Sequence, residues 1–114
     1  MNIEVKKKNK INILQLSGRF VLGEPTTLYA TKFKELLDAG ERLFVLDMRE
    51  VPFTDTSGQG EMVASAIRAR KQKGDIKLVL VPKGKVYELL TIVFLHKYFE
   101  IFEEMEDALA SFVK

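Results

Sequence analysis

The sequence predicts an α/β domain, with a mixed β-sheet of four to five strands packed with four to five α-helices. Short apolar runs of strand length alternate with segments in which apolar residues recur at helical spacing. Glycine or proline stands between most of these segments, as expected where one element ends and the next begins. After an opening pair of strands the order is helix, strand, helix, strand, which is typical of strands joined by helical crossovers.

The first forty residues predict a β-hairpin followed by a helix. Residues 3–5 and 11–16 bracket a polar segment in which Asn9 tolerates turn geometry. A loop over residues 18–24 follows, and Pro25 suits the first turn of a helix. The helical stripe that ends near Gly40 consists of Leu28, Tyr29, Phe33, Leu36 and Leu37.

The middle of the chain predicts two buried strands with a helix between them. Residues 43–46 and 76–81 are apolar runs, and the first suits a strand that is buried on both faces. Residues 62–70 have helical composition, and Gly74 closes the helix. We expect the helix to pack over the strands through Val63 and Ile67, with Phe44, Leu46, Leu78 and Leu80 buried beneath.

The last third predicts a helix, a short edge strand and a terminal amphipathic helix. Pro82 and Gly84 break the chain before the first helix, residues 100–102 suit the strand, and residues 105–112 suit the last helix. One side of the first helix should carry Val86, Leu89, Leu90 and Val93 or Phe94. The aromatic residues expected in the core are Phe94, Tyr98, Phe99 and Phe102.

Composition places the chain among soluble single domains, here residues 1–114. The 46% hydrophobic content is enough for a core, and the absence of cysteine excludes disulfides and cysteine-based metal sites. The apolar runs are shorter than the roughly 18 residues that span a membrane, and charges occupy the N-terminal segment. We therefore expect a cytoplasmic protein that does not insert into membranes.

The charge balance gives no support for a nucleic-acid partner. The net charge is +2, from 18 basic and 16 acidic residues. A basic cluster at residues 68–73 falls near a predicted helix C-terminus, where the dipole favours cations, and no aromatic residues interleave with it. Residues 100–107 are acidic.

Two neighbouring hydroxyl residues, Thr56 and Ser57, lie between the strand predicted over residues 43–46 and the helix that follows it. Asp55, Thr56 and Ser57 are all good helix N-caps, and the first turn of a helix has unpaired N–H groups that favour anions. A phosphate on Ser57 or Thr56 would be favoured there. From the residues alone, a structural N-cap or a tight turn that needs Gly58 is the favoured explanation of the cluster.

The segment from Leu46-Asp47-Met48 through Val51-Pro52-Phe53-Thr54-Asp55-Thr56-Ser57-Gly58-Gln59-Gly60 resembles the phosphoacceptor loop of the STAS domain. This is the family of bacterial anti-sigma-factor antagonists, and the similarity extends over nearly the whole chain. The resemblance implies that Ser57 is the phosphorylated serine, with Thr56 as the fallback acceptor. It also implies a partner that is both an anti-sigma factor and a serine kinase. Whether a phosphatase resets the serine is left open.

In this reading the partner binds the unphosphorylated form, and phosphorylation of Ser57 releases it. The residues implied in partner binding are Glu24, Asp55, Thr56, Ser57, Gly58, Gln59 and Glu61. Three of them bear on departures from the commoner family pattern. Val21 stands where many relatives carry an acidic residue, which leaves Glu24 as the nearest carboxylate. Gln59 replaces a residue that is usually apolar, and Thr56 replaces a serine.

Catalytic chemistry finds little support in the sequence. His96 is the only histidine, so a Ser-His-Asp triad would have to recruit it from a segment that suits packing. Gly58 and Gly60 are followed by no P-loop lysine. We expect no enzyme activity, no cofactor and no metal site. Two alternatives stay open beside the regulated binding module: an unphosphorylated scaffold or ligand-sensing subunit of a signalling or lipid-transport complex, and a small hydrolase.

Overall fold

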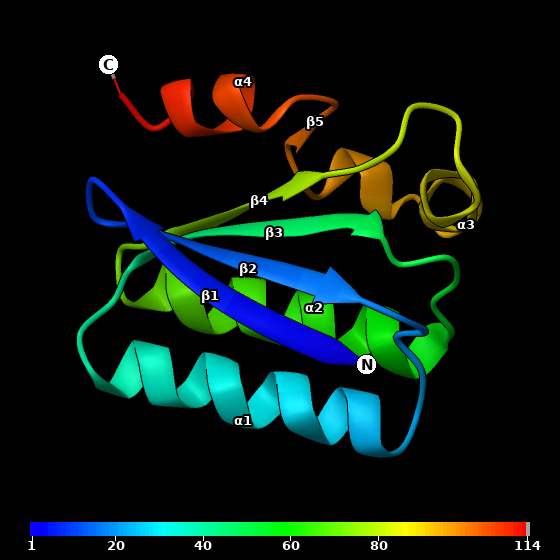
Figure 1. Ribbon diagram of the computed structural model, residues 1–114, viewed down its shortest axis with the longest axis horizontal. Helices are drawn as coiled ribbons and strands as arrows, with labels where there is room; N and C mark the ends of the chain where they lie inside the picture. Colours follow the sequence, from blue (N-terminus) through cyan, green and yellow to red (C-terminus); the bar gives the residue numbers. More distant parts are fainter. Residues whose placement is uncertain (114) are drawn as a thin grey trace.

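A five-stranded sheet forms the centre of the molecule, with its strands in the order β1-β2-β3-β4-β5. The computed structural model describes residues 1–113. The strands are β1 (Asn2–Lys8), β2 (Ile11–Ser17), β3 (Leu43–Glu50), β4 (Asp75–Val79) and β5 (Ile101–Phe102). β1 pairs with β2 in antiparallel fashion, whereas β2 to β5 are parallel to one another. The predicted mixed α/β sheet is confirmed (Figure 1).

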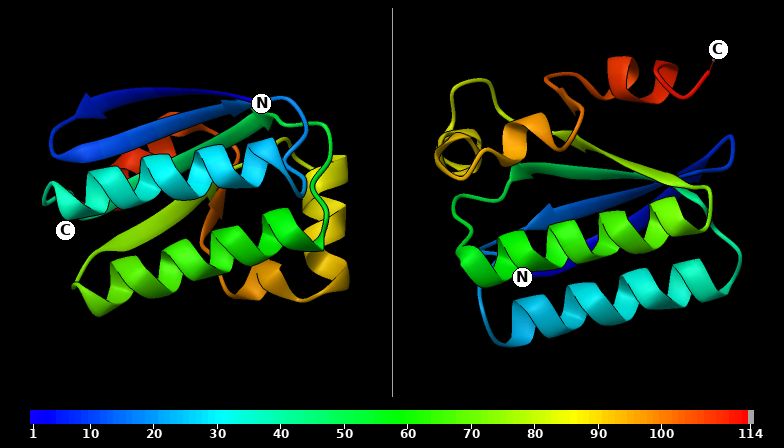
Figure 2. Two further views of the ribbon diagram at one scale, coloured as in Figure 1. Left: turned by 90° about the horizontal axis from the view of Figure 1, so that it is seen from below. Right: turned by 180° about the vertical axis from the view of Figure 1, so that it is seen from behind.

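Four α-helices cover this sheet unequally. They are α1 (Glu24–Asp38), α2 (Thr56–Lys71), α3 (Lys85–Ile92) and α4 (Met105–Ala110), and a short 3₁₀ turn, η1 (Leu95–Lys97), follows α3. Helices α1 and α2 lie side by side on one face, α4 lies on the other, and α3 sits at one end of the sheet (Figures 1 and 2). Most of the core therefore lies between the sheet and the α1–α2 layer.

The opening hairpin is tighter than the predicted loop over residues 6–10. β1 continues to Lys8, which pairs with Ile11, so only Asn9 and Lys10 form the turn. Both have positive φ, 50° and 72°, which is the conformation that two-residue hairpins require. The lysines at residues 6–8 are solvent-exposed along the edge strand, where charge discourages pairing with another chain.

The packing face of α2 differs from the prediction. Phe44, Leu46, Leu78 and Leu80 are buried as expected, and the partly buried Val63 packs against their cluster, but Ile67 is 43% exposed. The buried face instead follows the spacing 58, 62, 65 and 69 along the helix. The stripe was missed because one member is Ser65, whose hydroxyl lies 2.7 Å from the Tyr29 hydroxyl and donates to the carbonyl of Met62.

The corner after α3 also differs from the prediction. The side chains of Val93 and Phe94 are 44% and 68% exposed, and Tyr98 is 37% exposed, whereas Phe99 is buried. Phe94 adopts a left-handed conformation with φ 61°, so the chain reverses and the helical stripe stops at Leu90. The second core, under α4, holds a residue that the apolar pattern could not reveal. Lys77 is buried there, and its ammonium donates to the Ser111 hydroxyl at 2.8 Å.

Because β2 to β5 are parallel, their carboxyl ends share one edge of the sheet. The loops that follow β2, β3 and β4 therefore gather at the same end of the molecule, together with the first turns of α1 and α2 (Figures 1 and 2). In open α/β sheets this edge is where ligands are most often bound. The predicted hydroxyl cluster lies there.

Candidate functional site

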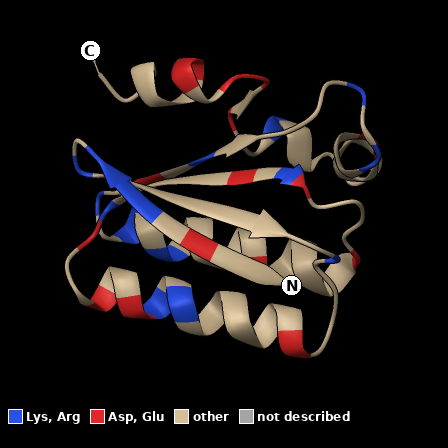
Figure 3. Cartoon of the chain, viewed as in Figure 1, with Lys and Arg blue, Asp and Glu red and all other residues tan. Residues whose placement is uncertain are grey.

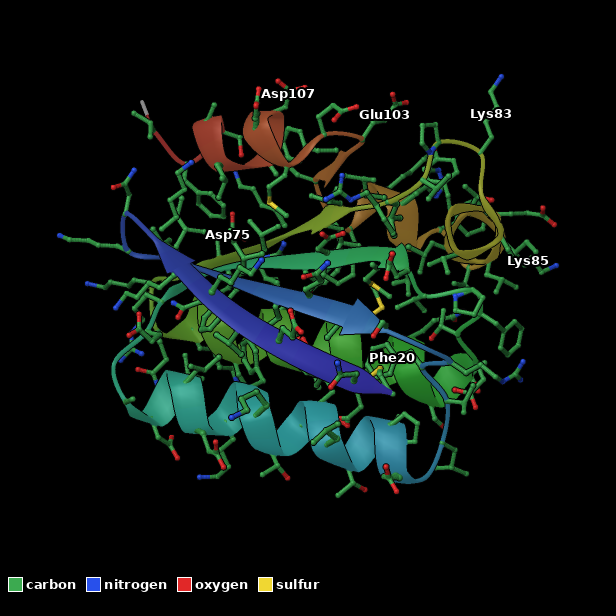
Figure 4. The ribbon with its side chains drawn as sticks, in the orientation of Figure 1. Phe20, Asp75, Lys83, Lys85, Glu103 and Asp107 are labelled. Atoms are coloured by element: carbon green, nitrogen blue, oxygen red, sulfur yellow. The ribbon has the colours of Figure 1, made fainter. Side chains whose placement is uncertain are left out.

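The loops after β2 and β3 are joined directly to each other. Phe20 and Thr54 form an isolated parallel bridge, and the Phe20 N–H donates to the carbonyl of Phe53 at 3.0 Å. The hydroxyl of Thr54 donates to the carbonyl of Phe20 at 2.8 Å. Phe20, labelled in Figure 4, is fully buried, and its ring lies against the Tyr29 ring with centroids 5.1 Å apart. The two loops therefore form one rigid platform beneath the start of α2.

Asp55 is the N-cap of α2 and also holds the neighbouring loop. One carboxylate oxygen accepts from the N–H of Gly58 at 2.9 Å, and the other accepts from the N–H of Leu22 at 3.0 Å. These backbone donors, Leu22 first and Gly58 second, hold the pKa of Asp55 below its ordinary value of 3.8. The carboxylate is therefore ionised at neutral pH, and it links the start of α2 to the loop before α1.

Gly58 is required by a close approach and not by an unusual backbone angle. A β-carbon at this position would overlap the carbonyl oxygen of Phe20 and the hydroxyl of Thr54. At Gly60, by contrast, a β-carbon would meet no other atom within 4 Å. The first glycine of the motif thus lets α2 settle onto the platform, whereas the structure offers no steric reason for the second.

Thr56 and Ser57 occupy the first two positions of α2. Thr56 is exposed and Ser57 is partly buried. Within residues 1–113, neither side-chain hydroxyl takes part in a hydrogen bond, although the adjacent Asp55 carboxylate is bonded on both oxygens. The cap is therefore complete without either hydroxyl. Both hydroxyls stand at the donor-rich start of a sixteen-residue helix, where an added anion is favoured.

The other residues predicted to bind a partner are distributed around this turn. Glu24 is the first residue of α1 and is exposed. Glu61 lies one helical turn after Ser57 and is partly buried, whereas Gln59 is buried with 7% of its surface exposed. A partner would therefore meet Glu24 and Glu61 more directly than Gln59. Lys and Arg concentrate on the hairpin end of β1 and acidic residues at the start of α4, while both signs occur at the Ser57 end (Figure 3).

Leu22 is a member of the site that sequence reasoning missed. Its backbone is held by Asp55, but its side chain is 74% exposed, which places a large apolar group beside the hydroxyl cluster. Nearby, the guanidinium of Arg19 lies 4.8 Å from the centroid of the Phe53 ring. An exposed leucine in a glycine-containing loop was the available signal. Its contact with a carboxylate 33 residues away could not be read from local spacing.

Neither His96 nor Asp47, the carboxylate directly after the apolar run of β3, is paired as a Ser-His-Asp triad requires. The Asp47 carboxylate accepts from the backbone and the guanidinium of Arg49, at 2.9 to 3.2 Å, as a turn-stabilising group would. His96, which lies on η1, packs against the rings of Tyr87 and Phe94. Across residues 1–113 no cluster of three or more histidine, aspartate or glutamate side chains could hold a metal ion. Nor does that part of the chain contain a helix long and apolar enough to cross a membrane.

The family model of the STAS domain matches residues 2–108. The chain therefore belongs to the STAS domain family, and the resemblance found in the phosphoacceptor segment extends to the whole fold. A search of curated proteins by sequence finds no match.

Solved structures with the same fold include anti-sigma factor antagonists. A putative anti-sigma factor antagonist from Thermotoga maritima has a TM-score of 0.83 at 19% identity, over 96% of this chain and 92% of that one. An anti-sigma factor antagonist from Mycobacterium paratuberculosis has a TM-score of 0.82 at 17% identity, with the same coverage. The Bacillus cell fate determinant SpoIIAA in its phosphorylated form has a TM-score of 0.69 at 12% identity, over 97% and 99% of the two chains. At these identities the likeness establishes the fold.

Proposed function

We propose that this protein is an anti-sigma-factor antagonist whose binding is controlled by phosphorylation of Ser57. In its unphosphorylated form it binds an anti-sigma factor that is also a serine kinase, in the cytoplasm, and so frees a sigma factor. Transfer of the γ-phosphate of ATP to Ser57 ends the complex, and a phosphatase would be needed to reset the switch. The partner supplies ATP and magnesium, so this chain carries no catalytic residue.

The observation that carries the proposal is the state of Ser57. Its hydroxyl lies on the first turn of a long helix and has no hydrogen-bond partner within residues 1–113. The local fold is completed by Asp55 and Gly58 instead. A hydroxyl that the fold does not use, held on a rigid platform at an accessible helix start, suits a phosphate acceptor. Membership of the STAS family and the antagonists among the structural neighbours support the same assignment.

Charge explains how phosphorylation would release the partner. A phosphoserine adds about −1.5 to −2 charges at neutral pH. The helix dipole stabilises the added phosphate by only ~0.3–1 kcal/mol, whereas an unpaired charge buried in a desolvated interface costs several kcal/mol. The ionised Asp55 carboxylate stands two residues before Ser57, and the Glu61 carboxylate one turn after it, so both add repulsion. The cost of burying the phosphate therefore exceeds the stabilisation by the helix dipole, and a complex that covers the phosphorylated turn is destabilised.

The test is affinity purification of the protein from its native host, with mass spectrometry of the bound partners and of residues 56 and 57. We expect the unphosphorylated form to retain a protein with both anti-sigma-factor and kinase character, and the free form to carry phosphate on Ser57. Thr56 is the fallback acceptor. Retention of transporter or sensor subunits, with no phosphate on either residue, would replace the proposal with the unphosphorylated scaffold or ligand-sensing function.

A further inference from the structure

A cavity of about 450 Å³ opens at the carboxyl ends of β4 and β5, away from the Ser57 turn. Its volume lies within the roughly 300–1,000 Å³ typical of small-molecule sites, and its position is the edge at which α/β sheets bind ligands. None of its lining residues belongs to residues 51–61. The lining consists of Leu80, Val81, Pro82, Lys83, Tyr87, His96, Ile101 and Glu103.

His96 lines this cavity and carries a hydrogen-bonding atom that the fold leaves unused. It is the only histidine of the chain. Its Nδ1 atom is shielded from solvent and has no hydrogen-bond partner among residues 1–113. A buried polar atom without a partner is uncommon in proteins and calls for an explanation. Because Nδ1 is shielded as the ring stands, it can meet a molecule in the cavity only if the ring turns about the torsion between Cβ and the imidazole, which is soft.

The backbone beside this ring is strained. Phe94 adopts a left-handed conformation at φ 61°, which is unfavourable for a bulky aromatic residue, and its own side chain is 68% exposed. The resulting reversal brings His96 back against α3, where its ring meets the Tyr87 ring edge-on, with centroids 6.3 Å apart. Strain of this kind is concentrated at functional sites.

The charges and surfaces of the cavity define what fits it. Lys83, on the loop after β4, and Glu103, just after β5, both line the cavity and carry opposite charges, so the lining has no net charge (both are labelled in Figure 4). Leu80, Val81 and Ile101 give it an apolar wall, and two aromatic rings at 70° to each other form a corner that suits a flat ring. We propose that this cavity binds a small uncharged aromatic molecule whose N–H or O–H group donates a hydrogen bond to Nδ1 of His96.

Indole and benzofuran test this proposal as matched probes, because they share one shape and only indole carries an N–H donor. Each is titrated into the full ¹⁵N-labelled chain while the imidazole nitrogens and the backbone amides are followed by NMR. The single histidine makes the imidazole signals unambiguous. The variant His96→Phe keeps an aromatic ring and removes Nδ1. Tyr98→Phe serves as the control variant, since Tyr98 lies outside the cavity lining.

We expect indole to shift the Nδ1 signal and the amides of Val81 and Ile101 in a saturable way. Benzofuran should bind about fivefold more weakly, which is the typical effect of one hydrogen bond. His96→Phe should weaken indole by a similar factor, and Tyr98→Phe should leave it unchanged. An Nδ1 signal that stays fixed while indole saturates the protein, or equal affinities for the two probes, would overturn the proposal. The probe comparison decides the matter even if His96→Phe fails to fold.

Discussion

Asp55 is expected to contribute measurably to stability, because one partly buried carboxylate holds the start of α2 and the loop before α1 together. Replacing the N-cap aspartate by alanine typically costs about 0.5–2 kcal/mol. The second bond, to the N–H of Leu22, adds roughly 0.5–1.5 kcal/mol, near the lower end because water can reach that donor. Asp55→Ala should therefore lower the free energy of unfolding by about 1–3 kcal/mol at pH 7. Asp55→Asn keeps one acceptor oxygen and should lose less.

Urea denaturation followed by circular dichroism measures this loss, with Asp38→Ala as the matched control. Asp38 is an exposed helical aspartate whose carboxylate accepts from Lys34 at 2.6 Å, an i,i+4 pair worth about 0.3–0.5 kcal/mol. The two variants lose the same charge. A loss for Asp55→Ala no larger than that for Asp38→Ala would refute the claim that the carboxylate joins the two loops.

The pH dependence gives a second check on the same residue. Because the folded protein lowers the pKa of Asp55 below 3.8, the stabilisation is complete above the pKa of the unfolded chain and is lost as the pH falls through the folded-state value. The stability gap between wild type and Asp55→Ala should thus be full at pH 7 and shrink below about pH 4, the ordinary range of aspartate. A gap that stays constant down to pH 3 would contradict the assignment.

Two further predictions concern packing, and the same denaturation assay measures both. Gly58→Ala should destabilise the protein by about 1–3 kcal/mol, because its β-carbon would overlap Phe20 and Thr54. The control, Gly60→Ala, should be neutral or stabilising by up to ~1 kcal/mol. Equal effects of the two substitutions would disprove the close approach at Gly58. Leu46→Ala should cost about 2–5 kcal/mol because the side chain is fully buried in the central strand, and an unchanged midpoint would show that this burial is wrong.

Local patterns predicted the sheet and the Ser57 turn because both depend on short-range chemistry. Apolar runs mark buried strands, and the Asp-Thr-Ser-Gly segment marks a helix start, whatever the rest of the chain does. The predicted N-cap was found at Asp55, one of the three candidates. The helix itself begins six residues before the stretch whose composition looked helical, because a cap and two glycines conceal its first turns.

Tertiary contacts account for what the patterns could not give. The face of α2 is set by its contact at Gly58, so Gly58, Ser65 and Ala69 are buried while Ile67 is exposed. Lys77 is buried because its ammonium reaches Ser111 and lies 4.4 Å from the centroid of the Phe112 ring, which no apolar pattern encodes. The hydrogen bond from the Leu22 N–H to Asp55 joins two loops that are far apart in the sequence, so no local pattern predicts it.

The affinity of the anti-sigma partner for variants at Ser57 tests the central claim most directly. Ser57→Ala removes one hydroxyl and adds no charge, so it should bind like wild type and resist release by ATP. Ser57→Asp places a carboxylate between Asp55 and Glu61 in the covered turn, and we expect it to bind at least tenfold more weakly. Thr56→Ala is the control and should be both bound and released normally. Equal dissociation constants for the alanine and aspartate variants at position 57, with no phosphate on Ser57 after incubation with kinase and ATP, would contradict the switch.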